Sequence, residues 1–199
     1  MRASWIGNAA LPLLAACATS PDYRTVDLTA EFVPVRFGGE GDIHRDGEGL
    51  VLEPGSPLTG GTFSISLPTT GYELELAVAR LGGVDFFCGL TLPTSRGCLT
   101  LVLGGWGGAV CGLSCLDGLD AARNTTRTLR HFVTAKDYAI TVRVDGEAIA
   151  VAIDSEPLFR AELGEQTVAV RAEVELTEPF GFCCYATKAA LRYLRWRAL

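Results

Sequence analysis

The stretch YELELAVARL, residues 72–81, alternates between two kinds of side chain. From Tyr72 to Val78 every second residue is large and apolar, whereas Glu73, Glu75 and two alanines occupy the positions between and after them. Successive side chains of a β-strand point to opposite faces, so this alternation predicts a half-buried strand of an antiparallel sheet.

Short runs of the same kind surround this stretch. Residues 138–153 alternate on both sides of an Asp-Gly pair, which predicts a β-hairpin, and residues 86–92 and 98–103 predict a second one. Further strands are expected at residues 33–37, 49–53, 61–67, 168–176 and 191–196. Helical periodicity is weak throughout, so the pattern predicts an all-β domain, a sandwich or jelly roll of two antiparallel sheets.

Composition narrows the class of protein. The chain has 199 residues, 48% of them hydrophobic and 20% charged, which fits one globular domain. With 17 basic and 23 acidic side chains the formal charge is −6. Such a chain has no general attraction to phosphate backbones, so we expect no nucleic-acid partner.

The N-terminus has the form of an export signal. An apolar run ends in Leu14-Ala15-Ala16-Cys17, which resembles the lipobox of bacterial lipoproteins, where cleavage precedes an acylated cysteine. This predicts a signal peptide at residues 1–16, lipidation of Cys17, a tether at residues 17–24 and a domain at residues 25–199. The expected location is the cell envelope, on the extracytoplasmic side in the outer membrane or periplasm. An ordinary secretory signal is the alternative.

Six cysteines remain after Cys17. An exported compartment permits disulfides, but no pairing follows from the spacing. Adjacent Cys183 and Cys184 are too close for relaxed disulfide geometry. With two histidines in the whole chain we predict no metal ligand of the zinc type.

The glycine-rich segment GGWGG, residues 104–108, is the first candidate binding element. No Lys-Ser or Lys-Thr follows, as a phosphate-binding loop would require. Its glycines permit positive φ angles and leave Trp106 as the only large side chain. The tryptophan either stacks on the apolar face of a sugar ring or folds back onto the core.

Polar residues follow this segment. Asp117, Asp120 and Asn124 join Trp106 as the predicted ligand-binding set. Their oxygens also suit a divalent cation such as Ca²⁺, and the sequence leaves open whether such a cation is a cofactor. The same residue types are common in turns and helix caps.

Acidic residues supply two further candidates. Asp85 follows a Gly-Gly pair and, with Arg80, predicts a carboxylate–guanidinium pair that is structural or ligand-binding. The stretch EVELTE, residues 173–178, approximates the carboxylate pattern of some jelly-roll glucanases, but a solvent-facing acidic strand is the better interpretation.

Four segments carry a resemblance to a known family: YELELAVARLGGVDFFCGLTLP, CLTLVLGGWGGAVCGLSCLDGLDAARNTT, YAITVRVDGEAIAVAID and ALRYLRWRAL. Over residues 50–199 the chain resembles the 3-keto-disaccharide hydrolase-like domain family of the concanavalin A-like lectin/glucanase superfamily. The resemblance implies a jelly roll, a link to carbohydrate and cleavage of glycosidic bonds in 3-oxidised sugars. It supplies no catalytic set.

The reaction that the resemblance implies indicates which residues are candidates for catalysis. A 3-keto group acidifies the hydrogen at C2, so elimination needs a base, for which Asp85, Glu73 and Glu75 are candidates, and Arg80 would stabilise the enolate. We therefore expect a lipid-anchored domain that binds carbohydrate through its GGWGG loop and sheet face. Its contact with a membrane would be through the anchor alone. The alternatives are a 3-keto-glycoside hydrolase and a non-catalytic envelope scaffold.

Overall fold

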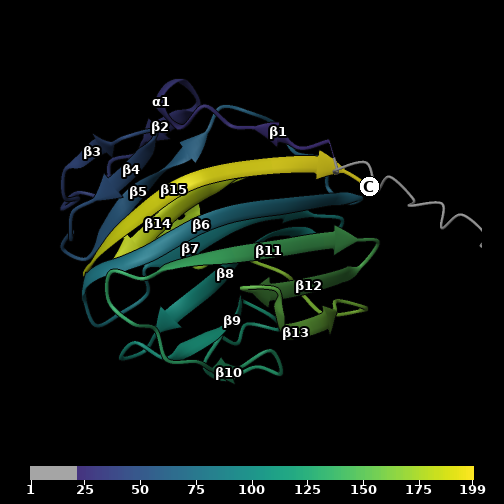
Figure 1. The fold of residues 1–199 in the computed structure, drawn as a ribbon. Coiled ribbons are helices and arrows are strands. Elements are labelled where there is room, and N and C mark those ends of the chain that lie inside the picture. Colours follow the sequence, from purple (N-terminus) through teal and green to yellow (C-terminus); the bar gives the residue numbers. More distant parts are fainter. Residues whose placement is uncertain (1–21) are drawn as a thin grey trace, which may run out of the picture.

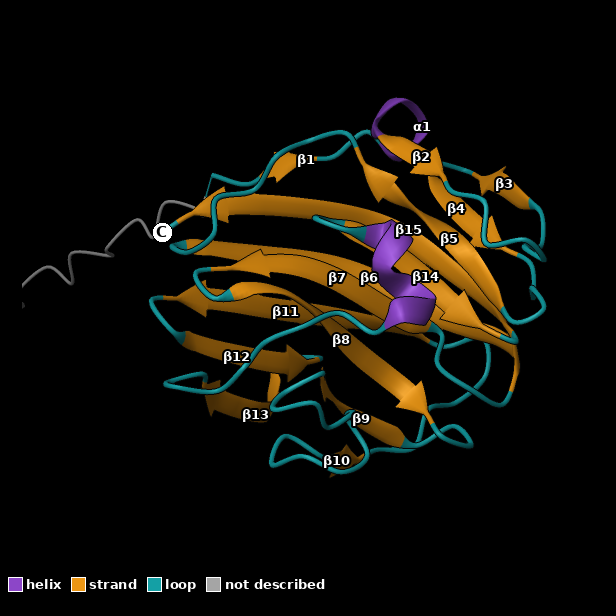
Figure 2. Cartoon of the chain, turned by 180° about the vertical axis from the view of Figure 1, so that it is seen from behind, coloured by secondary structure: helices purple, strands orange, loops and turns teal. Residues whose placement is uncertain are grey.

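The structure, a computed structural model, describes residues 22–199 and forms two antiparallel sheets packed face to face (Figures 1 and 2). The predicted signal peptide, Cys17 and most of the predicted tether lie outside these residues. Neither helix within residues 22–199 has the length and apolar character needed to cross a membrane.

We call the first sheet sheet A and the second sheet B. Sheet A runs in the order β13 (Glu156–Glu162), β12 (Ala148–Ile153), β11 (Asp137–Asp145), β6 (Tyr72–Gly83), β15 (Thr187–Ala198), β4 (Gly49–Leu52), β3 (Ile43–Asp46), and β1 (Arg24–Thr25) also pairs with β15. Sheet B runs in the order β10 (Thr128–Leu129), β9 (Val110–Ser114), β8 (Gly97–Gly105), β7 (Cys88–Thr94), β14 (Gly181–Tyr185), β5 (Leu58–Phe63), β2 (Phe32–Pro34). The two short helices are α1 (Leu28–Glu31) and the 3₁₀ helix η1 (Ala172–Thr177).

Strand β6 illustrates how the sequence produces the sandwich. Tyr72, Leu74, Leu76 and Val78 are fully buried between the sheets, as the alternation predicts. The intervening Glu73 belongs to the outer face of sheet A. Burying the apolar row of each strand against the other sheet is the main favourable term in such a fold.

Both predicted hairpins are confirmed. Strands β11 and β12 pair up to Asp145 and Ala148, with Gly146 in the turn at a φ of +63°. Strands β7 and β8 pair up to Thr94 and Gly97. The predicted fold class, an all-β jelly-roll sandwich of two antiparallel sheets, is therefore correct.

The strand predicted at residues 168–176 is wrong, because its C-terminal half folds as η1. Val174 is buried, whereas Leu176, on the same face of the expected strand, is 47% exposed. The Thr177 hydroxyl instead donates to the carbonyl of Val174 at 2.6 Å. Contacts that recur every three residues match the three-residue turn of a 3₁₀ helix, and they override the alternation.

The six cysteines of the described part are free thiols. Four of them are buried, and Cys98 and Cys115 are half-buried. Burial raises the pKa of the buried Cys88 and Cys111 thiols. These buried side chains therefore act as small apolar groups of the sandwich.

Candidate functional site

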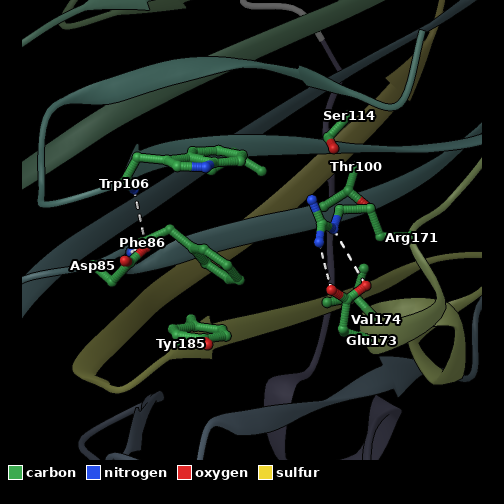
Figure 3. Close-up of a pocket in the computed structure, with 10 residues that line it drawn as sticks. Asp85, Phe86, Thr100, Trp106, Ser114, Arg171, Glu173, Val174 and Tyr185 are labelled. Carbon is green, nitrogen blue, oxygen red and sulfur yellow. Dashed lines mark hydrogen bonds and ion pairs between the residues drawn. The ribbon is translucent and has the colours of Figure 1, made fainter. Parts of the chain in front are cut away.

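A groove of about 260 Å³ opens on the outer face of sheet B (Figure 3). It is lined by Asp85, Phe86, Thr100, Val102, Trp106, Ser114, Arg171, Glu173, Val174 and Tyr185. Thr100 of β8 and Ser114 of β9 are paired in register and bring two hydroxyl groups to the groove. The groove thus combines a polar region on the sheet with side chains from three loops and η1.

Aromatic side chains form one side of the groove. The rings of Phe86 and Tyr185 lie with their centroids 5.6 Å apart, and Trp106 lies beside them (Figure 3). Trp106 is 44% exposed and Tyr185 is 37% exposed. With the half-buried Phe86, these two side chains present an aromatic face to the groove. The alternative that Trp106 folds back onto the core is therefore not what the structure adopts.

The GGWGG loop holds Trp106 in a left-handed backbone conformation, with a φ of +48°. Gly104 and Gly108 on either side also have positive φ angles. Asp85 stabilises this conformation, because its Oδ1 accepts hydrogen bonds from the backbone N–H groups of Trp106 at 3.2 Å and Phe86 at 2.8 Å. The strained loop is thus fixed from a neighbouring loop.

Arg80 supports the same loop from behind. Its Nη2 donates to the carbonyl oxygens of Asp85, Gly104 and Gly108, at 3.2, 3.1 and 2.9 Å. The guanidinium lies over the ring of Phe87, and burial lowers the pKa of Arg80. The predicted pairing of Arg80 with the Asp85 carboxylate is wrong, because the contact is with the backbone carbonyl. Arg80 is 7% exposed and does not line the groove, so it is not placed to stabilise an enolate there.

A charged pair forms the other side of the groove. Arg171 Nε donates to Glu173 Oε2 at 3.2 Å, and Arg171 Nη2 donates to Glu173 Oε1 (Figure 3). Arg171 Nη1 also lies 3.6 Å from Asp120 Oδ2. The hydrogen bonds from Arg171 lower the pKa of Glu173, so the pair is ionised at neutral pH.

Helix η1, which carries Glu173, lies across the outer face of sheet B (Figure 2). The hydroxyl groups of Thr177 and Thr91 are 2.6 Å apart, and those of Thr91 and Thr100 are 2.9 Å apart. Val174 packs with Leu58 and Cys183 on the sheet. These contacts close one end of the groove and fix the Arg171–Glu173 pair there.

Glu73 and Glu75 lie elsewhere, on the outer face of sheet A. Glu73 accepts hydrogen bonds from Tyr23 and Arg197, and Glu75 accepts them from Tyr193 and Arg195. These three alternative candidates for the base therefore do not share a site, because the sandwich separates Asp85 from the two glutamates onto opposite outer faces. Asp85 is the one member of the predicted catalytic set that lines the groove.

Asp117, Asp120 and Asn124 hold the loops beside the groove without lining it. Asp117 Oδ1 accepts from the backbone N–H of Thr167 at 2.8 Å, and Asn124 Nδ2 donates to the carbonyl of Leu113 at 2.7 Å. Asp120 contacts Arg171 and thereby positions one wall. Of the predicted ligand-binding set, the structure brings Trp106 alone to the groove, and residues 22–199 contain no cluster of three metal-ligating side chains.

Of the ten lining residues, two were predicted as site residues, Asp85 and Trp106, and the other eight include Phe86, Arg171, Glu173 and Tyr185. Phe86 adjoins Asp85 in the sequence, so its proximity to a predicted site residue is a signal that could have identified it. Arg171 and Glu173 come together because of the 3₁₀ turn, and no local sequence pattern predicts that turn. Tyr185 enters through the pairing of β14 with β7, which is a long-range contact.

Solved structures share this fold at low sequence identity. The carbohydrate-binding module CBM66 from Bacillus subtilis aligns with a TM-score of 0.54 at 11% identity, over 84% of this chain and 96% of that chain. A Bacillus subtilis protein of unknown function with a galectin-like fold gives 0.57 at 12% identity, over 89% of each chain. The carbohydrate recognition domain of Emp46p gives 0.57 at 10% identity, over 85% and 88%.

These similarities show the class of fold, a galectin-like jelly-roll sandwich. No protein-family model matches the chain, and no curated protein is similar enough in sequence to count as a relative. What the groove itself can do follows from its lining. An exposed aromatic face beside hydroxyl and carboxylate groups suits a ligand with one apolar face and a polar edge.

Proposed function

We propose that this domain binds carbohydrate in the groove of sheet B, with Trp106 stacked on the apolar face of a sugar ring. The exposure of Trp106 on a loop fixed by Asp85 and Arg80 is the observation that carries the proposal. A ring held in place before binding loses little conformational entropy when the ligand arrives. Structural neighbours described as a carbohydrate-binding module and a carbohydrate recognition domain add support.

The size of the groove suggests how much of a glycan it contacts. Its volume of about 260 Å³ is below the range of about 300–1,000 Å³ typical of sites for drug-sized ligands. We therefore propose that one sugar residue occupies the groove. Asp85 Oδ2, which has no hydrogen-bond partner within residues 22–199, is available to accept a hydrogen bond from its polar edge.

The experiment measures binding of the purified protein to a panel of oligosaccharides, with Trp106→Ala as the test variant. We expect a loss of at least about tenfold in affinity, since a buried stacking contact contributes more than 1.4 kcal/mol. Val133→Ala is the matched control, because Val133 is 64% exposed and does not line the groove. Unchanged binding by Trp106→Ala would refute the proposal.

A hydrolase of the 3-keto-glycoside type is the second candidate, which the family resemblance suggests. One observation favours it: Asp85 lines the groove, and its Oδ2 makes no hydrogen bond within residues 22–199. A free carboxylate oxygen there can serve as the base that removes the proton at C2. Release of free sugar from 3-keto-glycosides, abolished by Asp85→Asn, would establish the enzyme. Absence of release from a protein that binds glycans would leave the binding function.

We also propose export and lipid anchoring at Cys17, on the extracytoplasmic side of the cell envelope. This rests on the lipobox-like sequence that ends at Cys17. Mass spectrometry of the N-terminal peptide from membranes tests it, with Cys17→Ala as the control. If neither glycans nor 3-keto-glycosides interact with the protein, the remaining function is that of an envelope scaffold.

A further inference from the structure

The charged side chains that line the groove differ in how many hydrogen-bonding atoms they leave free for a ligand. Arg171 is the single basic residue among the lining side chains, which also include the carboxylates of Asp85 and Glu173. Recognition of an acidic sugar requires a guanidinium or ammonium group with free donors. The hydrogen bonds of these three side chains therefore decide which sugars fit.

Carboxylates of the protein surround Arg171, and Glu173 accepts two of its five N–H donors. Its Nε and Nη2 form a two-point contact with Glu173, and its Nη1 faces Asp120 at 3.6 Å. Both sides of the guanidinium are thus directed at carboxylates of the protein itself. A carboxylate or sulfate on the ligand that approaches Arg171 would meet the charges of Glu173 and Asp120 at close range.

Asp85 presents the opposite situation. Its Oδ1 accepts from the backbone N–H groups of Trp106 and Phe86, whereas its Oδ2 has no partner within the described part of the chain. Figure 3 shows the Asp85 carboxylate close to the backbone N–H of Trp106, on the aromatic side of the groove. A carboxylate oxygen next to an aromatic face is favourable for hydroxyl groups and more so for an ammonium group.

Other basic residues nearby do not change this picture. Arg80 lies behind the GGWGG loop, with its Nη2 bound to backbone carbonyls, and Arg123 pairs with Asp120 at 2.9 Å. Neither of them lines the groove. They balance charge in the wall but offer no donor to a ligand.

We infer that the groove is selective for sugars without acidic groups and prefers an amino sugar to its neutral counterpart. The inference rests on the proposed binding function and deepens it by naming the class of ligand. Asp85 Oδ2 is the specificity-determining atom on the aromatic side. Glu173 acts on the other side by keeping Arg171 occupied.

The test compares methyl glycosides of glucose, glucosamine and glucuronic acid, together with the galactose series, by calorimetry at low and high salt. In the series that binds, we expect the amino sugar to bind at least about threefold tighter than the neutral sugar. The uronic acid should bind at least about tenfold weaker than the neutral sugar. Both differences should shrink as salt screens the charges.

Two variants test whether Asp85 and Glu173 cause these differences in affinity. Asp85→Asn should remove the preference for the amino sugar, and Glu173→Gln should free Arg171 and raise the affinity for the uronic acid. Glu48→Gln is the matched control, because Glu48 is exposed on the β3–β4 turn of sheet A. Circular dichroism verifies that each variant is folded, and the salt dependence of the unmodified protein tests the inference without any variant.

The outcomes separate the two proposals. Equal or tighter binding of the uronic acid by the unmodified protein would overturn the inference and leave carbohydrate binding intact. If no sugar of any charge binds, the proposed function fails and the inference falls with it. If the charge preference survives in both variants, Asp85 and Glu173 are not its source.

Discussion

Asp85 and Trp106, 21 residues apart in the sequence, are joined by a hydrogen bond of 3.2 Å from the backbone N–H of Trp106 to Asp85 Oδ1. The bond connects the loop before β7 to the loop between β8 and β9. One carboxylate therefore both fixes the aromatic side of the groove and contributes a free oxygen to it. This hydrogen bond fixes the backbone from which the exposed ring of Trp106 projects.

Removing the guanidinium of Arg80 should destabilise the domain and weaken binding together. Arg80→Met leaves three backbone carbonyl oxygens without their donor, and we expect a loss of about 3 kcal/mol in the free energy of unfolding. Urea unfolding measures it. A loss below about 1 kcal/mol would show that water replaces the guanidinium.

The GGWGG loop supplies a matched pair of glycine substitutions. A Cβ at Gly104 would lie 2.3 Å from Arg80 Nη2, whereas a Cβ at Gly107 would meet nothing within 4 Å, and both residues have positive φ angles. Each alanine carries a backbone cost of about 1 kcal/mol, and the clash at Gly104 adds about 2 kcal/mol. Thermal unfolding of Gly104→Ala and Gly107→Ala compares them, and equal losses would contradict the packing described around Arg80.

The hydroxyl group of Thr177 should control how firmly η1 covers the sheet. Thr177→Val keeps the shape but removes the bonds to Thr91 and to the Val174 carbonyl, at a cost of about 1–2 kcal/mol. Amide hydrogen exchange across residues 172–177 should become faster. Thr177→Ser, which retains the hydroxyl group, serves as the control and should exchange at nearly the original rate.

Acid should weaken the domain through Glu73. Burial acts to raise the pKa of this carboxyl, but hydrogen bonds from Tyr23 and Arg197 outweigh burial and lower it below the ordinary value of 4.5. A depressed pKa in the folded state means that the stabilisation is complete above about pH 4.5 and is lost as the pH falls through the folded-state pKa.

Urea unfolding at pH 7, 4.5 and 3 measures this effect. The free energy of unfolding of the unmodified protein should fall more steeply below pH 4.5 than that of Glu73→Gln, which has no carboxyl to protonate. Glu48→Gln should follow the unmodified protein. Parallel curves for all three proteins would exclude Glu73 as a contributor.

The sandwich could be predicted because its strands carry their own signals. The alternation from Tyr72 to Val78 and the turn at Gly146 depend on residues close in sequence, and the structure has them as expected. The same alternation placed Glu73 on a strand, and the Gly-Gly pair placed Asp85 at the start of another, without saying which sheet or which outer face each would occupy. The sheet and face of each residue depend on long-range strand pairing. Glu73 and Asp85, both candidates for the base, therefore lie on different outer faces of the sandwich.

The groove was predictable on one side and not on the other. Trp106 and Asp85 both follow glycine pairs that leave a single functional side chain, so the residue types alone pointed to them. Arg171 and Glu173 looked like part of an acidic strand. Their role depends on a 3₁₀ turn that is stabilised by Thr91 of a distant strand, and no periodicity within residues 168–176 encodes that contact.

The position of Tyr23 has a consequence for how the domain can be displayed. Its ring lies against the guanidinium groups of Arg195 and Arg197 on the outer face of sheet A, with its hydroxyl on Glu73. The groove opens on the opposite outer face. A support joined to the chain ahead of Tyr23 would therefore approach the back of the domain. The groove would face outward, open to ligands too large to pass beneath the domain.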